Sequence, residues 1–276
     1  MKAYGKLVHV ELHRVRWLLA ALMVLTLVIQ VAALVWTARS GVADIREAET
    51  IGRSAFFSDD KLSFSWLIFN TQVLFALPIL LSIAVLVLYV FLIWYRDWLG
   101  RSTFIYRLLT IPTARRNVYF AKATAVLLLI LILISFQLIL LPLEEWLFKL
   151  VVPSDLWEPS VFTDAILANQ AFVWVIPLDG SRFLVSIGLG MAGVFALFGA
   201  ILLERSYRIR GILLALLYLA ACLTIVVYPL LTLGIDQTYS FLYPFEILLI
   251  ELAIIIAVTL FSIWMSLRLL DKKITV

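Results

Sequence analysis

Six apolar runs dominate this 276-residue chain, and each is long enough to cross a membrane as a helix. A bilayer interior holds no water to satisfy backbone N–H and C=O groups, so such runs have to be helical. They cover residues 17–37, 66–95, 117–142, 182–203, 211–232 and 244–267. The sequence therefore predicts an all-α integral membrane protein with six transmembrane helices in a single domain, 1–276.

The overall composition agrees with a membrane protein. Hydrophobic residues make up 64% of the chain and charged residues 14%, whereas soluble domains average about 45–50% and about 25%. The only cysteine, Cys222, lies inside an apolar run, so no internal disulfide can form. A chain of this kind is expected to be a multi-pass protein of a bacterial-type plasma membrane.

The basic residues are unevenly distributed among the segments that join the runs. Segments 1–16, 96–122, 204–210 and 268–276 hold sixteen of the 22 Lys and Arg residues and only four acids. Because cytoplasmic loops are enriched in Lys and Arg, both termini are predicted to be cytoplasmic. The opposite orientation would place those sixteen cations outside and is rejected. Because the distribution of Lys and Arg is explained by the orientation of the spans, it does not indicate nucleic-acid binding, and we expect no nucleic acid partner.

The first sixteen residues predict an interfacial helix. Their apolar and basic side chains occupy opposite helical faces. The apolar face holds Tyr4, Leu7, Val8, Leu12 and Val15, and the basic face holds Lys2, Lys6, His9, His13 and Arg16. Such a helix lies in the membrane surface with its cations towards anionic headgroups, so membrane lipids are expected partners.

Residues 143–181 form the longest segment predicted on the outer side. Its stretch 161–178 is apolar enough to suggest a seventh span, but it contains Asp164 and Asn169, which are costly in hydrocarbon. A span there would also move the basic segment 204–210 outside. We therefore expect an outer-surface segment, as an amphipathic helix lying on the membrane.

The inner loop 96–122 carries a helical pattern of its own. It holds six basic residues and one acid between two spans. Ser102 or Thr103 can cap a short helix, at about 101–111, that Pro112 ends. Its apolar stripe consists of Phe104, Ile105, Leu108 and Leu109. A stripe with no membrane to bury it indicates a docking element for another protein.

Motifs for metal and nucleotide binding are weak. His9 and His13 are four residues apart, but Glu11 is displaced from the H-E-x-x-H pattern and both histidines fit the basic face. No metal site is predicted. The chain has no G-x-x-x-x-G-K-[ST] loop and no G-x-G-x-x-G, so any nucleotide must be bound by another chain.

Acidic residues lie in or beside two of the apolar runs. Glu144 and Glu145 faintly resemble the acidic motif of membrane-embedded CAAX-type proteases, but those enzymes need later histidines and this chain has none beyond residue 13. The pair instead predicts a solvated helix end. Glu251 lies deeper in its run than any other ionisable residue, so it lines a translocation path or forms a structural hydrogen bond. Glu246 and Gln137 are further path candidates.

Small residues recur every fourth position in the fourth run. They are Gly188, Ala192, Ala196 and Ala200. Small residues at this spacing let two helices approach closely. Packing within the chain is favoured over a dimer seam, and the sequence leaves both open.

A known family shares the patterned inner loop and the topology. The loop reads Tyr106-x-Leu108-Leu109-x-x-Pro112-x-x-Arg115 and continues to Lys122. It resembles the loop from coupling helix to third span in ABC-2 type permeases, the membrane subunits of ATP-binding-cassette exporters. The topology resembles theirs over the whole chain. The chain departs from many members because its last outer segment, 233–243, is short and 143–181 is long.

The resemblance implies partners and a role for the loop. A cytoplasmic ABC ATPase subunit would receive the 101–111 helix in a groove, and ATP and Mg would be bound there and not by this chain. The implied coupling residues are Arg101, Phe104, Ile105, Arg107, Leu108 and Leu109. A second permease chain, identical or a paralogue, would complete the path.

The sequence is therefore interpreted as a non-enzymatic permease subunit of an ATP-driven exporter. Apolar spans with few polar residues favour an amphipathic or lipidic cargo, such as a peptide, drug or lipid. The alternative is a scaffold or signalling subunit that anchors a cytoplasmic partner without transport. An intramembrane enzyme is disfavoured because histidine and serine constellations are missing.

Overall fold

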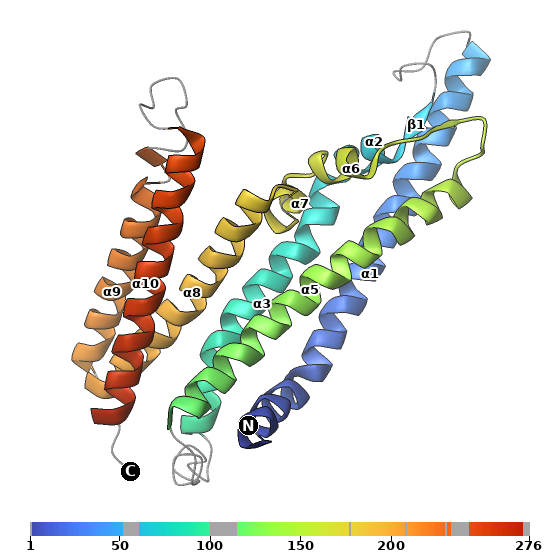
Figure 1. Ribbon diagram of the computed structural model, residues 1–276. Coiled ribbons are helices and arrows are strands. Elements are labelled where there is room, and N and C mark those ends of the chain that lie inside the picture. Colours follow the sequence, from blue (N-terminus) through green and yellow to red (C-terminus); the bar gives the residue numbers. More distant parts are fainter. Residues whose placement is uncertain are drawn as a thin grey trace. The chain divides into compact units, whose positions relative to one another are not determined.

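The computed structural model describes residues 2–51, 61–99, 115–176, 178–207, 209–229, 231–232 and 243–272. The long helices are α1 (Lys2–Ile51), α3 (Gln72–Leu99), α5 (Arg115–Val151), α8 (Gly180–Tyr207), α9 (Ile209–Pro229) and α10 (Pro244–Lys272) (Figure 1). All six are long and apolar enough to cross a membrane. The prediction of a mainly helical chain with six helices capable of crossing a membrane is confirmed.

Five short elements also belong to the described part. They are α2 (Phe64–Asn70), α6 (Phe162–Leu167), α7 (Gln170–Val175) and a pair of two-residue strands, β1 (Leu62–Ser63) and β2 (Trp157–Glu158). The strands pair in parallel, and the Leu62 N–H donates to the Leu156 carbonyl at 2.8 Å. These strands add a small β element to a fold predicted as all-α.

Several predicted boundaries differ from the structure. The expected interfacial helix 1–16 and span 17–37 belong to one continuous helix, α1, whose 50 residues measure about 75 Å. The expected span 66–95 is divided at Thr71, so its excess length belongs to α2. Thr71 ends α2, and its hydroxyl and N–H both bond the Leu67 carbonyl.

The stretch 161–178 is neither a seventh span nor one amphipathic helix. It forms α6 and α7, which have six residues each and are far too short to cross a bilayer. Asn169 separates them, and its side chain accepts from the Ala171 N–H at 2.9 Å as the cap of α7. The polar residue that argued against a span therefore starts a new helix.

The chain divides into two compact units. Unit one contains Met1–Arg14, Leu86–Leu129 and Asp179–Val276, and unit two contains Val15–Val85 and Ile130–Leu178. Helices α1, α3 and α5 contribute to both. Each unit has its own packing and is described separately below.

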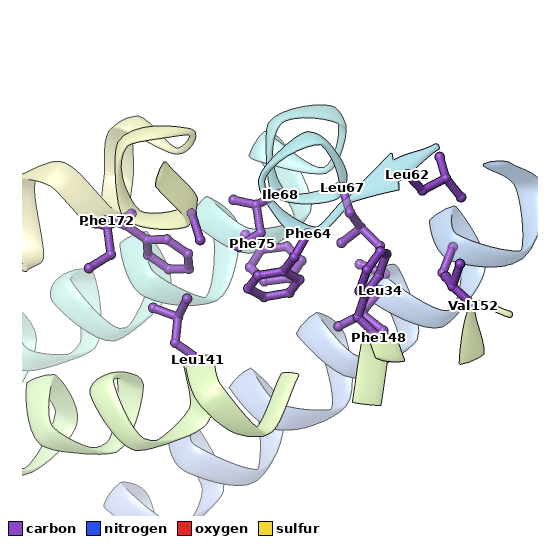
Figure 2. Close-up of a cluster of buried hydrophobic side chains, with 14 of the residues drawn as sticks. Leu34, Leu62, Phe64, Leu67, Ile68, Phe75, Leu141, Phe148, Val152 and Phe172 are labelled. Atoms are coloured by element: carbon purple, nitrogen blue, oxygen red, sulfur yellow. The ribbon is translucent and has the colours of Figure 1, made fainter. Parts of the chain in front are cut away.

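Unit two has a hydrophobic core built by α1, α2, α3, α5, α6 and α7 (Figure 2). Phe64 of α2 lies 5.9 Å from Phe148 of α5 between ring centroids. Phe75 of α3 meets Phe172 of α7 edge to face at 6.0 Å. The amide of Asn169 donates to the Gln72 carbonyl at 3.3 Å, which ties the α6–α7 corner to the start of α3. The short elements are thus part of a packed core.

Glu144 lies within this core-facing stripe of α5. It is 1% exposed, and Leu141 and Phe148, one turn before and after it, are equally buried. Neither carboxylate oxygen has a hydrogen-bond partner in the described part of the chain. The predicted solvated helix end is therefore wrong for Glu144, although Glu145 is on the outer face and pairs with Lys149 at 2.7 Å.

In unit one the small-residue stripe of α8 packs within the chain. Ala192, Ala196 and Ala200 are at most 6% exposed, and a Cβ on Gly188 would come within 3.0 Å of Ile255 on α10. Gly211 allows α9 to begin close to the end of α8, because a Cβ there would lie 2.5 Å from the Leu203 carbonyl oxygen. Helix α10, the second helix after α8, packs closely against α8 at Gly188 of this stripe.

Aromatic rings join α8 to the other helices of unit one. Trp94 of α3 meets Phe198 of α8 edge to face at 5.4 Å. Tyr119 of α5 contacts Trp94, Phe195 and Phe198 at centroid distances of 5.7–6.3 Å. These rings are at most 5% exposed. These rings form an aromatic cluster next to the polar site described below.

Candidate functional site

The predicted docking helix lies outside the described residues. This holds for its whole range, 101–111, and for its named positions, which are Arg101, Phe104, Ile105, Arg107, Leu108 and Leu109. The helices on either side of it are described: α3 ends at Leu99 and α5 begins at Arg115. What the structure contributes is the site where these two ends meet the amino-terminal part of α1.

A buried lysine joins all three helices at this place. The Lys122 ammonium donates to Asp97 Oδ2 at 2.5 Å, to Glu11 Oε1 at 3.3 Å and to the Ile93 carbonyl at 2.6 Å. Lys122 is 1% exposed, Asp97 2% and Glu11 6%. All three N–H donors of the ammonium therefore have acceptors, contributed by α1 and α3.

Two arginines complete the group from its rim. Arg96 donates to Glu11 Oε2 at 2.8 Å, and Arg14 lies 3.5 Å from both Glu11 Oε1 and Asp97 Oδ1. Their side chains are 38% and 30% exposed. We call these five residues the charge cluster. It has three cations and two anions, so each buried carboxylate has more than one cationic partner.

The energetics of the charge cluster depend on Lys122. An ion taken out of water without a partner costs several kcal/mol, and breaking a buried pair by removing one partner costs about 3–5 kcal/mol. Lys122 is the most buried of the three cations, and the indole of Trp94 lies 5.3 Å from its nitrogen. The cluster therefore fixes α1, α3 and α5 to one another, because no single charge can leave alone.

Each buried charge occupies a position where its helix otherwise shows an apolar residue. Glu11 lies between Val8 and Val15 on the buried face of α1, and all three are at most 9% exposed. Lys122 follows Val118 by one turn on the buried face of α5. A charged side chain at a core-facing position needs a partner of the other sign on the helix that packs against it. Applied to α1 and α5 together, this rule could have predicted the charge cluster from the sequence.

A second contact ties the end of α3 to the end of α8 in unit one. The Arg205 guanidinium lies 4.7 Å from the ring of Tyr95 and 5.2 Å from that of Trp98. The Tyr95 hydroxyl also donates to the Glu204 carboxylate. Cation–π contacts of this kind contribute about 0.5–2 kcal/mol each. The end of α3, from which the loop starts, is thus attached to α8 as well as to α1.

The predicted translocation residues belong to different units, with Glu251 and Glu246 in unit one and Gln137 in unit two. Glu251 is half-buried on α10, and Glu246 is exposed and accepts from the Tyr243 N–H at 2.9 Å. Gln137 is in unit two, is 4% exposed, and donates to Gln30 at 3.2 Å. The acids of the charge cluster and Glu144 of α5 are more buried from solvent than Glu251, and the roles predicted for Glu251, Glu246 and Gln137 stay predictions.

The two histidines of α1 belong to its exposed face. His9 and His13 have ring centroids 6.1 Å apart, and both are exposed, as are Lys6 and Arg16. Within the described ranges, no three metal-ligating side chains gather at one place. At the described positions the apolar and basic residues of this part of α1 therefore lie on opposite faces, with Glu11 on the buried side, and the predicted interfacial placement stays a prediction.

Comparison with known proteins gives no match: no family model, no curated protein and no solved structure resembles this chain. The function has to be inferred from the charge cluster, from the loop whose ends it holds, and from the membrane-spanning character of the helices.

Replacing Lys122 by methionine should destabilise unit one strongly. The substitution keeps the volume but removes the buried cation that both carboxylates share, and leaves them only the partly exposed Arg14 and Arg96. We therefore expect the free energy of unfolding to fall by about 3–5 kcal/mol. Arg116→Met is the matched control, since Arg116 makes an exposed pair with Asp271 at 3.8 Å and should change stability by at most about 1 kcal/mol. Thermal unfolding in detergent measures both. Equal stability of the two variants would contradict the role assigned to Lys122.

Proposed function

We propose that this chain is the membrane subunit of an ATP-driven exporter, of the ABC-2 permease type, and that residues 100–114 dock a separate ATPase. The observation that carries the proposal is the charge cluster, which lies at both ends of this loop and anchors them to α1. A basic loop with an apolar stripe and firmly held ends is suited to transmitting force from a partner. A simple connector needs neither feature.

The coupling would run from the loop into the helices. A partner that moved the predicted 101–111 helix would pull on α3 and α5 through the backbone, and the pair of Asp97 with Lys122 would keep these two helix ends together. Because Glu11 binds the same ammonium, α1 has to move with them. The stack of Arg205 on Tyr95 and Trp98 would carry the same displacement to α8. One docking event would thereby reposition four membrane helices.

The energy source would lie in the partner. The chain has no phosphate-binding loop, so ATP and Mg would be bound and hydrolysed by the ATPase subunit. A second permease chain, identical or a paralogue, would enclose the path. The apolar character of the spans favours an amphipathic or lipidic cargo, and the bacterial-type plasma membrane is the proposed location. A scaffold that holds a cytoplasmic partner without transport is the alternative.

Docking through the apolar stripe predicts a selective loss of the partner. Phe104→Asp should leave the chain inserted and folded but release the ATPase, because a carboxylate in an apolar interface costs several kcal/mol. Ser102→Asp is the matched control, since it adds the same charge at a position where aspartate caps a helix as well as serine. Affinity purification from membranes, with quantification of the bound ATPase, measures both variants. Full retention by Phe104→Asp would refute docking through the stripe.

The proposed orientation predicts which side of the membrane each exposed position faces. In a Cys222→Ala background, Ser154→Cys should react with an impermeant thiol reagent on intact cells. Arg210→Cys should react only after the membrane is permeabilised. Both side chains are exposed in the structure, so burial does not limit either reaction. Labelling of position 210 on intact cells would overturn the proposal that both termini are cytoplasmic.

A further inference from the structure

Helices α2 and α6 of unit two pack against each other (Figure 1). The side chains on and beside these two helices line an open hollow. Its volume is about 450 Å³, within the range of about 300–1,000 Å³ typical of small-molecule sites. The residues that line it are Ser63, Ser65, Trp66, Phe69, Asp164, Leu167 and Ala168. They comprise two aromatic rings, two hydroxyls and one carboxylate, with no lysine or arginine.

The walls of the hollow are held in place by the core beneath them. On α2 the inward side chains Phe64, Leu67 and Ile68 are at most 2% exposed (Figure 2). On α6 the inward side chains Ala165 and Ile166 are at most 1% exposed. Both helices are therefore fixed by their buried faces, and the residues on their other faces present a preformed surface.

Hydrogen bonds fix the ends of the same two helices. Ser63 caps α2 by accepting from the Trp66 N–H at 3.1 Å. The carbonyl of Ala168, just after α6, accepts from the Gln72 amide at 3.4 Å. A ligand entering the hollow would thus meet a rigid frame and would not have to order it, which lowers the entropic cost of binding.

The side chains that line the hollow favour a positively charged ligand. Asp164 supplies the one formal charge, and no Lys or Arg in the described ranges lies within ion-pair distance of it. Phe69 is 60% exposed and presents its ring to a ligand. Aromatic faces attract cations, most of all those with an apolar surface and little hydration. One carboxylate and two neutral hydroxyls form a weak ligand set for a divalent metal ion.

We propose that this hollow binds a hydrophobic organic cation, of the quaternary-ammonium class. The cationic centre would lie against the Asp164 carboxylate and the aromatic rings, and the apolar part would cover Leu167 and Ala168. The site needs neither an ATPase nor transport, so it goes beyond the proposed exporter role and stays testable if that role fails.

The test is equilibrium dialysis of radiolabelled benzyltrimethylammonium against the full-length chain in lipid nanodiscs, with empty nanodiscs subtracted. Saturable binding is expected. Asp164→Asn should weaken it about tenfold or more, and Phe69→Ala should weaken it several-fold. The matched control is Asp155→Asn, which removes another exposed carboxylate of unit two that does not line the hollow. This variant should bind the probe as the unmodified chain does.

A neutral competitor separates charge recognition from simple partitioning. Neopentylbenzene has the shape of the probe without its charge and should compete at least tenfold less well. Thermal unfolding of each variant shows that it is folded, as expected for substitutions of exposed side chains. Absence of saturable binding, equal binding by Asp164→Asn, or equal competition by neopentylbenzene would each overturn the proposal.

Discussion

The three-way contact of Lys122 with Asp97 and Glu11 is the interaction on which the account of this molecule depends. A lysine and two carboxylates removed from water are tolerated only together. Each of them comes from a different helix, and two of those helices lead directly into the 100–114 loop. The contact therefore couples α1 to the two helix ends from which the loop starts and into which it leads. Because of this coupling, we propose that the basic loop with its apolar stripe transmits movements of a bound partner to the membrane helices.

The two units of the chain use different means of holding their helices. Unit one relies on ion pairs, cation–π contacts and close packing against the small residues of α8. Unit two relies on a hydrophobic core into which short helices and a two-residue strand pair are folded. The exposed surface of that second unit carries the proposed organic-cation hollow. The chain thus presents one candidate contact for a protein partner and a separate one for a small molecule.

Much of the fold followed from the sequence, because the apolar runs were long enough to require membrane helices. The extra elements did not, since α2, α6 and α7 are too short for a periodic signal and depend on tertiary contacts such as that of Phe75 with Phe172. The charge cluster was also missed. The pattern places Asp97 in the inner loop 96–122, Lys122 at its end where the third span begins, and Glu144 at a solvated helix end, whereas all three occupy core-facing helical positions. Hydropathy averaged over a segment hides such single residues.

The most direct test of the central claim is native mass spectrometry of the chain, affinity-purified in mild detergent from its own cells. The account predicts a complex that contains this chain and a second protein with a G-x-x-x-x-G-K-[ST] nucleotide-binding loop, and that dissociates when residues 101–111 are replaced by a glycine–serine linker. Recovery of the chain alone, or with partners that lack any nucleotide-binding motif, would contradict it.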